Sequence, residues 1–319
     1  MESKGYKCNI FLRQRPNLLE TATFELNRDK IAVIGQHRSS NLGKFFEFIK
    51  SFVHLFFYFA NNRPRVAVSI GGQELCLVSY IFGTKVISFN DDPGHGIVFK
   101  ITANTATELV LPKIIGYNSE NSFGYPSYKE LAHLHPSTFK SNYSALEKYN
   151  LQKYSYVIFR EQDSVSMVYR NVSIGDFKEV VSKLENKKLK LVFSLENKKN
   201  IDYYEKRGVI LKEPVSDFHS IIKYSALVIT TGDTLAREAS LLGVPAIYAG
   251  RRDMPINKEL IKLGLIFKID DISKIPNFIR LLTNSVYQQN YKKRAQAYLN
   301  TCANTSEIIT ERIDRLAKC

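Results

Sequence analysis

The segment from Thr231 to Glu238 has the residue types and spacing of a turn that binds phosphate and sugar. It reads Thr-Gly-Asp-Thr-Leu-Ala-Arg-Glu and directly follows an apolar run at 226–230. If that run is a buried strand and a helix opens after the turn, free backbone N–H groups and the positive end of the helix dipole meet at one place, where a phosphate can bind. Glu238 lies about one turn inside this helix, so its carboxylate is within reach of both hydroxyls of a ribose.

A structural interpretation of the same segment is equally open. In it, Asp233 or Thr234 only caps the helix, and the Glu238 carboxylate is solvated. Both interpretations share the helix end, because Gly243 in the sequence Gly-Val-Pro is typical of the left-handed residue that ends helices.

A second polar cluster reads Asn-Asp-Asp-Pro-Gly-His and follows the apolar run at 85–89. Asp91, Asp92 or His95 could supply a general base, because close like charges raise the pKa of one carboxyl group toward neutrality. The two carboxylates could also hold a divalent cation together with phosphate oxygens. The alternative is an Asx-type turn whose geometry is set by the Pro-Gly pair.

Two adjacent glycines, Gly71 and Gly72, follow the run at 65–70 and precede a helical pattern. They permit a ligand to approach the backbone closely, or they make a tight turn. The sequence has no complete G-x-G-x-x-G, no phosphate-binding G-x-x-x-x-G-K-[ST], and no G-x-S-x-G with matching triad partners. A nicotinamide dinucleotide site of the usual kind is therefore not expected.

Short β-branched runs alternate with helical patterns along the chain, which is typical of βαβ units and parallel sheets. In the first half we expect strands at 8–12, 30–34, 65–70, 85–89 and 108–111, and helices at 44–61 and 74–82. In the second half we expect strands at 156–159, 190–194, 208–211, 226–230 and 246–249, and helices at 174–184, 201–207, 218–224 and 234–242. Ligands of such sheets bind beyond the carboxyl ends of the strands, which are the positions of the motifs above.

The predicted fold class is α/β, with two Rossmann-like, doubly wound parallel-sheet domains that face a cleft. Residues 1–153 form the predicted N-terminal domain on the acceptor and catalytic side. Residues 154–286 form the nucleotide-binding domain, and 287–319 form helices that pack back toward the first domain. The length of 319 residues and the hydrophobic fraction of 44% suit two packed domains.

Charge and cysteine usage narrow the class of protein further. Lys and Arg outnumber Asp and Glu by 45 to 31, but the lysines are spread along the chain and form no nucleic-acid-binding pattern. We therefore expect no nucleic-acid partner. The four cysteines lie far apart, and His133 and His135 are predicted to be loop residues, so no protein metal site is predicted. Without a signal peptide or a spanning segment, we expect a cytoplasmic location.

The stretch 45–60 is rich in phenylalanine and is flanked by lysines. We expect this helix to be covered by its sheet. In the alternative it touches a membrane that carries a lipid-linked acceptor, at which the protein would be peripheral.

The segment Thr-Leu-Ala-Arg-Glu-Ala-x-x-Leu-Gly-Val-Pro, after a strand and a small-residue turn, resembles the donor-site segment of GT-B-fold proteins. These include MurG-type glycosyltransferases and UDP-N-acetylglucosamine 2-epimerases. The chain more closely resembles a largely archaeal domain-of-unknown-function family that shares this fold. The segments 66–72 with 88–95, 129–132 and 156–160 also fit, and the resemblance runs from about residue 1 to residue 271.

By this resemblance, Thr231, Gly232 and Thr234 line the diphosphate and Glu238 holds the ribose. Arg160 would meet the phosphates through a bidentate, charge-assisted contact.

The chain departs from the family pattern in two places. Relatives tend to have a run of glycines where this chain has Thr-Gly-Asp. An ionised Asp233 would therefore repel phosphate unless a cation, Arg251 or Arg252 offsets it. Relatives also begin with a strand and a long helix before a segment like 2–11, so the first N-terminal strand is expected to be missing here.

The predicted function is that of a glycosyltransferase-like enzyme that binds a nucleotide-activated sugar, with a divalent cation as an optional companion of the nucleotide sugar. The first alternative is a non-catalytic or degenerate GT-B-fold binding protein. The second is a nucleotide-sugar 2-epimerase, which ranks lower because epimerases of this fold use more carboxylates around the sugar than the sequence assigns. The sugar, the acceptor and the oligomeric state are not determined by the sequence.

Overall fold

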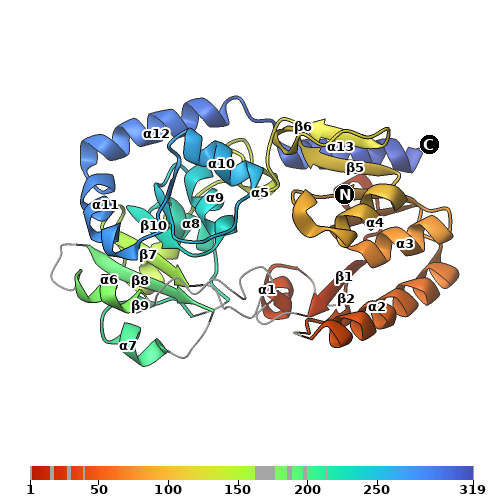
Figure 1. Ribbon diagram of the computed structural model, residues 1–319, viewed down its shortest axis with the longest axis horizontal. Coiled ribbons are helices and arrows are strands. Elements are labelled where there is room, and N and C mark those ends of the chain that lie inside the picture. The colour runs from red at the N-terminus through yellow and green to blue at the C-terminus, as the bar shows by residue number, and fades with distance from the viewer. Residues whose placement is uncertain are drawn as a thin grey trace. The chain divides into compact units, whose positions relative to one another are not determined.

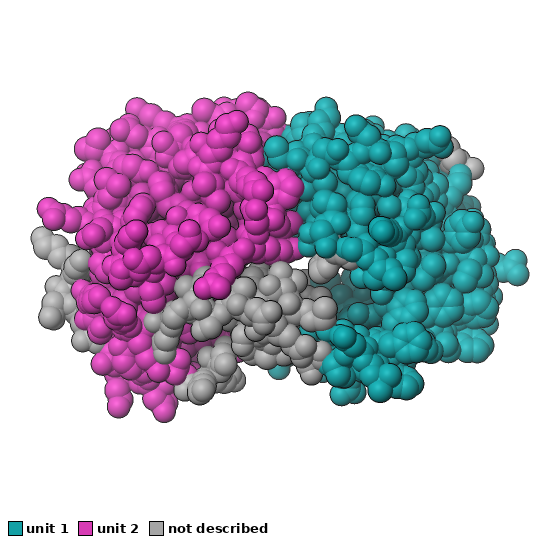
Figure 2. All heavy atoms as spheres, viewed as in Figure 1, with its two compact units in different colours: residues 1–132, 303–319 teal, residues 133–302 magenta. Residues whose placement is uncertain are grey.

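A computed structural model describes residues 2–14, 18–26, 30–38, 40–161, 177–184, 189–196, 200–212 and 214–318. The start of the helix predicted at 174–184 lies outside these residues. The chain divides into two compact units (Figure 2). Unit 1 comprises residues 1–132 and 303–319, and unit 2 comprises residues 133–302.

The described strands of unit 1 form two separate parallel sheets (Figure 1). The strands are β1 (Ile10–Gln14), β2 (Ile31–Gln36), β3 (Val66–Ile70), β4 (Lys85–Phe89), β5 (Glu108–Pro112) and β6 (Ser122–Tyr125). The first two pair with each other, and the other four form a sheet in the order β3-β4-β5-β6. The helices are α1 (Leu18–Glu25), α2 (Asn41–Asn62), α3 (Gln73–Ile81), α4 (Ile97–Thr105) and α13 (Thr305–Lys318).

Both faces of the four-stranded sheet are covered, because successive strand residues point to opposite faces. In β4, Val86 packs in a cluster with Leu55 of α2 and Cys76 of α3. Its neighbour Ile87 packs in a different cluster with Ile313 of α13. The helices expected in 287–319 are α12 (Ser285–Leu299) and α13, separated by residues 300–304. Of these two helices, α12 belongs to unit 2 and α13 to unit 1.

Helix α2 is only half covered. It begins after Ser40, whose side chain accepts the Gly43 N–H, and ends at Arg63 in a left-handed conformation. One face is buried through Glu47, Ser51, Leu55 and Phe59, while large apolar side chains on the other face are exposed: Leu42, Phe45, Phe46, Ile49, Val53 and Phe57. The expected cover by the sheet therefore holds for one face only. Among the described residues, no helix is long and apolar enough to span a membrane.

Unit 2 has one six-stranded parallel sheet in the order β12-β11-β10-β7-β8-β9. The strands are β7 (Tyr156–Glu161), β8 (Lys190–Leu195), β9 (Val209–Ile210), β10 (Leu227–Thr230), β11 (Ala246–Tyr248) and β12 (Ile266–Lys268). This is the strand order of dinucleotide-binding Rossmann folds. The order in which successive strands are added reverses between β7 and β10, while the two strands themselves run parallel. The helices, besides α12, are α6 (Lys178–Ser182), α7 (Ile201–Glu205), α8 (Phe218–Lys223), α9 (Asp233–Leu241), α10 (Pro255–Lys262) and α11 (Ile275–Leu282).

The central strands of unit 2 are buried on both faces, as their apolar runs predict. Val157 and Phe159 of β7 pack with residues of α6 and α11 in one continuous core. On the opposite face, the Tyr156 hydroxyl donates a hydrogen bond to the Ile221 carbonyl of α8. Each buried residue of this kind stabilises the unit by about 1.5–3 kcal/mol relative to an exposed one, so the sheet is a rigid base for its loops.

Candidate functional site

A row of polar side chains crosses the carboxyl edge of the unit 2 sheet at its reversal point. Arg160 is in register with Ser194 on one side and with Thr230 on the other, and Thr230 is in register with Tyr248. Register partners of parallel strands point to the same face, so these four residues share one face. In open α/β sheets, this edge is where ligands bind.

Arg160 is held in a fixed position within this row. Its guanidinium group donates hydrogen bonds to the Ser194 hydroxyl and, over 2.8 Å, to the Glu196 carboxylate. It also lies 5.9 Å from the centroid of the Phe218 ring. A guanidinium group positioned in this way presents planar donors suited to a phosphate, whereas the phosphate contact itself stays a prediction.

The turn between β10 and α9 leaves the helix start without a side-chain cap. The Thr231 N–H donates to the Arg160 carbonyl over 3.3 Å, and the Gly232 N–H donates to the Thr230 hydroxyl over 2.9 Å. Gly232 is the N-cap residue, so the expectation that Asp233 or Thr234 caps the helix is wrong. Glycine has no side chain that could accept the first N–H groups, and the positive end of the helix dipole favours an anion at this place.

Asp233 is buried and neutralised. Its carboxylate lies 3.1 Å from Nη1 of Arg252 and 3.4 Å from Nη1 of Arg237. Arg252 thus supplies the offset that the sequence analysis required. Arg237, which is fully buried and also contacts the Asn257 side chain at 3.2 Å, adds a second one. With two guanidinium groups on one carboxylate, the turn carries net positive charge.

Sequence reasoning missed Arg237, although Asp and Arg four residues apart on a helix commonly pair. The loop after β11 completes the network, since the Arg252 N–H donates to the Tyr248 hydroxyl over 3.0 Å. Burial, with a smaller effect from Asp233, raises the pKa of Tyr248 to about 12. The phenol is therefore neutral at physiological pH and stays a fixed support of the loop.

Helix α9 has a single accessible stripe. Seven of its nine residues are buried, and the two that are partly exposed are Thr234 and Glu238. They are four positions apart and therefore lie on the same face. The stripe starts at the helix end, where a phosphate would bind, and leads to the Glu238 carboxylate, which would accept hydrogen bonds from a ribose.

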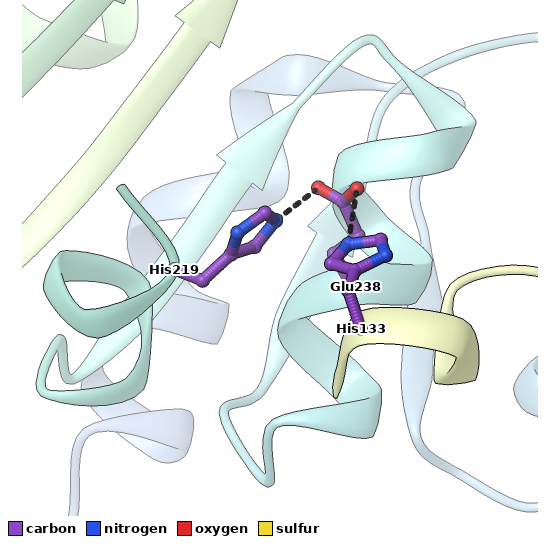
Figure 3. A group of neighbouring side chains, drawn as sticks. All are labelled: His133, His219 and Glu238. Atoms are coloured by element: carbon purple, nitrogen blue, oxygen red, sulfur yellow. Dashed lines mark ion pairs between the residues drawn. The ribbon is translucent and has the colours of Figure 1, made fainter. Parts of the chain in front are cut away.

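Glu238 contacts two histidine rings and is not simply solvated (Figure 3). Its Oε2 lies 3.6 Å from Nε2 of His219, and its Oε1 lies 3.9 Å from Nε2 of His133. Partial burial and the neighbouring His219 lower the pKa of His133, while Glu238 acts in the opposite direction. The carboxylate comes from α9, and the rings come from α8 and from the short helix α5 (Leu131–Leu134).

The structure also corrects the expectation for the two histidines near residue 134. His133 lies in α5 and not in a loop. His135 lies outside α5, and its ring contacts the Ser137 hydroxyl at 2.7 Å and the Cys302 carbonyl at 3.4 Å. Sequence reasoning missed His219, because one histidine near the start of a short helix gives no signal of its distant partners.

In unit 1, the two predicted glycines form the turn between β3 and α3. Gly71 has a φ of 64°, in the left-handed region that favours glycine, and its N–H donates to the Phe89 carbonyl over 3.1 Å. Gly72 caps α3, and its N–H donates to the Ser69 hydroxyl over 2.8 Å. The turn thus explains both glycines structurally, and contact with a ligand stays a prediction.

The acidic cluster after β4 contains the Asx turn of the alternative interpretation. The Asp92 N–H donates to the Asn90 side chain over 2.9 Å, and the Asp92 carboxylate accepts the Gly94 N–H over 3.2 Å. Asp91 pairs with Nζ of Lys129 at 2.7 Å. The backbone of His95 ends a short 3-10 helix, and its side chain lies outside the described atoms. A catalytic role for Asp91, Asp92 or His95 remains a prediction.

A further carboxylate of unit 1 is buried. Glu130 is only 1% exposed, and the sequence analysis did not select it as a site residue. Burial raises the pKa of Tyr125, and the charges of Glu130 and Asp91 both raise it further. Both carboxylates therefore act on the same phenol at the carboxyl end of β6.

Comparison with solved structures confirms the GT-B-like α/β fold. The chain is similar to the UDP-GlcNAc 2-epimerase of Methanocaldococcus jannaschii, solved with UDP-GlcNAc and UDP, with a TM-score of 0.60, 15% identity and 88% of this chain and 93% of that chain covered. MnaA of S. aureus, solved with UDP, gives 0.64 at 15% identity and covers 96% of both chains. The spinosyn rhamnosyltransferase SpnG, solved with spinosyn aglycone, gives 0.60 at 11% identity, with 96% of this chain and 100% of that chain covered.

The resemblance found in the sequence is confirmed at the family level. An uncharacterized protein of Methanocaldococcus jannaschii is 23% identical over 295 residues, which cover 87% of this chain and 84% of that protein. The family described as protein of unknown function, DUF354, matches residues 2–318. Because that match spans nearly the whole sequence, the chain belongs to the DUF354 family.

Proposed function

We propose that this protein binds a nucleotide-activated sugar at the carboxyl edge of the unit 2 sheet and transfers the sugar to an acceptor. The observation that carries the proposal is the accessible stripe of α9. It begins at a helix end capped only by Gly232 and reaches the Glu238 carboxylate. In the proposed complex, the diphosphate lies at Gly232 and Thr234, and the ribose hydroxyls donate to Glu238.

The charges at this edge support an anionic ligand. Asp233 faces two guanidinium groups, and Arg160 is fixed across the neighbouring strands. Fixed donors at the end of a helix stabilise phosphate without rearrangement. Similar structures that were solved with UDP or UDP-GlcNAc support a nucleotide sugar as the ligand class.

In the proposed transfer, an acceptor hydroxyl gives its proton to a general base and its oxygen attacks the anomeric carbon. The bond between that carbon and the diphosphate oxygen breaks, and the negative charge that develops on the diphosphate meets Arg160 and the start of α9. The general base of this step is predicted from the sequence alone to be Asp91, Asp92 or His95. A divalent cation that accompanies the diphosphate belongs to the same proposal.

Epimerisation of the bound sugar is the second candidate, and a specific observation favours it. Unit 1 contains the buried carboxylate of Glu130 besides those of Asp91 and Asp92, and the charges of Glu130 and Asp91 both raise the pKa of Tyr125. Removing a proton from carbon and returning one to the other face requires paired acid and base groups. The similar structures include several UDP-GlcNAc 2-epimerases.

The test is a calorimetric and thermal-shift screen of UDP, GDP, CDP, dTDP and their sugars, with and without Mg²⁺. We expect one nucleotide to bind, and Glu238→Gln to weaken it by about 10–100-fold, because a hydrogen bond to a charged group contributes about 1.5–3 kcal/mol. Glu179→Gln is the matched control, since Glu179 is an exposed carboxylate of α6 in the same unit. If no nucleotide or nucleotide sugar binds at millimolar concentration, the proposal is wrong.

Product analysis separates the two reactions. Incubation of the protein with the sugar form of the nucleotide that binds and an added hydroxyl acceptor should release the free nucleoside diphosphate and a glycosylated acceptor if the sugar is transferred. It should give a second nucleotide sugar of the same mass if the sugar is epimerised.

A further inference from the structure

We propose that His133, His219 and Glu238 form a binding site for a divalent transition-metal ion of the zinc class. The three side chains converge from α5, α8 and α9 (Figure 3). One ligand atom from each lies within 4.8 Å of the other two. Two imidazole nitrogens and a carboxylate oxygen are the donor set of many three-residue metal sites.

The distances suit an ion after a small adjustment of the side chains. Zinc binds imidazole nitrogen and carboxylate oxygen at about 2.0–2.2 Å, which spaces tetrahedral ligand atoms about 3.4 Å apart. The two carboxylate oxygens lie 3.6 and 3.9 Å from the histidine nitrogens that they face. The centroids of the two histidine rings are 4.9 Å apart, and the ring planes make an angle of 56°. A modest rotation of one ring therefore brings both ring nitrogens within bonding distance of one ion.

Exposure falls along the three ligands in a way that permits both capture and retention of an ion. The His133 side chain is 51% exposed, that of His219 is 31% exposed, and that of Glu238 is 16% exposed. An ion can therefore enter past His133 and be held by the two less exposed groups. Three protein ligands leave at least one coordination position open to water or to a ligand, as in catalytic metal sites.

The donor set also selects the kind of metal. Mg²⁺ and Ca²⁺ prefer oxygen ligands alone, whereas imidazole favours zinc and its neighbours cobalt, nickel and copper. The proposed site therefore differs from one in which Mg²⁺ accompanies a diphosphate.

The site shares Glu238 with the proposed ribose contact. A carboxylate that is bound to a metal ion cannot accept both ribose hydrogen bonds in the same way, so metal and nucleotide should bind competitively. This consequence rests on the proposed function, whereas the metal site itself does not, because metal binding is measured on the protein alone.

The first experiment titrates the full chain with Co²⁺, follows visible absorption, and then displaces Co²⁺ with Zn²⁺ in a calorimeter. We expect one ion per chain and a spectrum of nitrogen and oxygen ligation. His133→Gln and His219→Gln should each weaken binding by at least about 10–100-fold, the loss seen when even an outer partner of a metal ligand is removed. His135→Gln is the matched control and should bind the ion like the wild type.

Two results would overturn the site. One is equal affinity of the wild type and both histidine variants, and the other is thiolate charge-transfer absorption, which would place the ion at cysteines. Because the His133 side chain is half exposed, His133→Gln should keep the fold, and circular dichroism checks this. If His219→Gln unfolds, the His133 variant alone decides the question.

The second experiment titrates UDP into the protein with one equivalent of Zn²⁺ already bound, so that no free ion remains to chelate the diphosphate. We expect at least about tenfold weaker UDP binding than without the metal. Equal UDP affinity would overturn the shared use of Glu238. Failure of UDP and the other nucleotides to bind at all would count against the proposed function, while the cobalt titration would still decide the metal site.

Discussion

The carboxyl edges of the two parallel sheets hold their charged groups in different ways. In unit 2, the buried Asp233 is held by Arg237 and Arg252, which come from another turn of the helix and from a separate loop. In unit 1, Asp91 and Asp92 stay partly exposed. Asp91 pairs with Nζ of Lys129, and the turn that carries the two carboxylates is also held by hydrogen bonds between residues two positions apart.

The difference follows from the cost of burial. A buried charge costs several kcal/mol unless paired, so the buried Asp233 needs charged partners, which Arg237 on its own helix and Arg252 in the loop after β11 provide. A partly exposed carboxylate keeps part of its hydration, so pairing contributes less to the stability of Asp91, whose partner Lys129 is itself 43% exposed. The comparison teaches that the buried carboxylate at the edge of unit 2 depends on two arginines, while the carboxylates at the edge of unit 1 stay partly exposed.

The largest effect expected from this division concerns Asp91. Asp91→Asn keeps the shape of the side chain and removes the base, so turnover should fall by about 10²–10⁴-fold while UDP affinity stays unchanged. Steady-state kinetics and calorimetry measure the two quantities. Glu120→Gln, a change at an exposed turn of unit 1, is the control and should alter neither. A parallel loss of UDP binding in Asp91→Asn would contradict the division of roles.

The next effect concerns the stability of the unit 2 edge. Arg237→Met removes one of the two arginines that pair with the buried Asp233, and breaking a buried pair costs about 3–5 kcal/mol. Lys183→Met breaks the exposed pair with Glu179 and should cost no more than about 0.5 kcal/mol. Urea unfolding followed at both variants measures the difference, and equal losses would refute the argument from burial.

The smallest effect is a pH dependence of the stability of unit 1. It comes from the buried carboxylate of Glu47, which lies away from the edge of the sheet. The N–H of Gln36 holds the pKa of Glu47 below its ordinary value of 4.5, with help from Arg38 against the effect of burial. A lowered pKa in the folded state gives stability that is present above pH 4.5 and is lost as the pH falls through the folded value.

Melting temperatures of the wild type and of Glu47→Gln test this sign. The wild type should melt higher at pH 7, and the gap should close at pH values below both pKa values of Glu47. A gap that is constant with pH would mean that the carboxylate charge contributes nothing. Lys183→Met is the control, because it shows how far the melting temperature falls in acid when the Glu47 carboxylate is unchanged.

The parts of the molecule that were predictable from sequence are those fixed by neighbouring residues. The strand at 85–89 was predicted with the bounds that the structure shows, because its apolar run ends at an Asn-Asp turn. The end of α9 at Gly243, with a φ of 75°, follows from the same local chemistry. The turn after β10 was placed correctly for this reason too, except that Asp233 and Thr234 already belong to α9.

Elements that depend on distant packing were missed. The segment 97–105 is rich in β-branched residues, which favour strands, yet it forms α4 because Phe99 and Ala103 pack against the sheet residues Leu109 and Leu111. The contacts of Arg237 with Asn257 and of His219 with Glu238 join residues about 20 positions apart, and no local pattern indicates them. The sequence therefore indicates the turn of the candidate site, but not the residues that contact Asp233 and Glu238 from other parts of the chain.

The most direct test of the central claim is a crystal structure of the protein with UDP. The account predicts the diphosphate at the N–H groups of residues 232–234 with Arg160 beside it, and the ribose hydroxyls on the Glu238 carboxylate. A nucleotide that is bound elsewhere in the chain, with Glu238 in contact only with its two histidines, would contradict it.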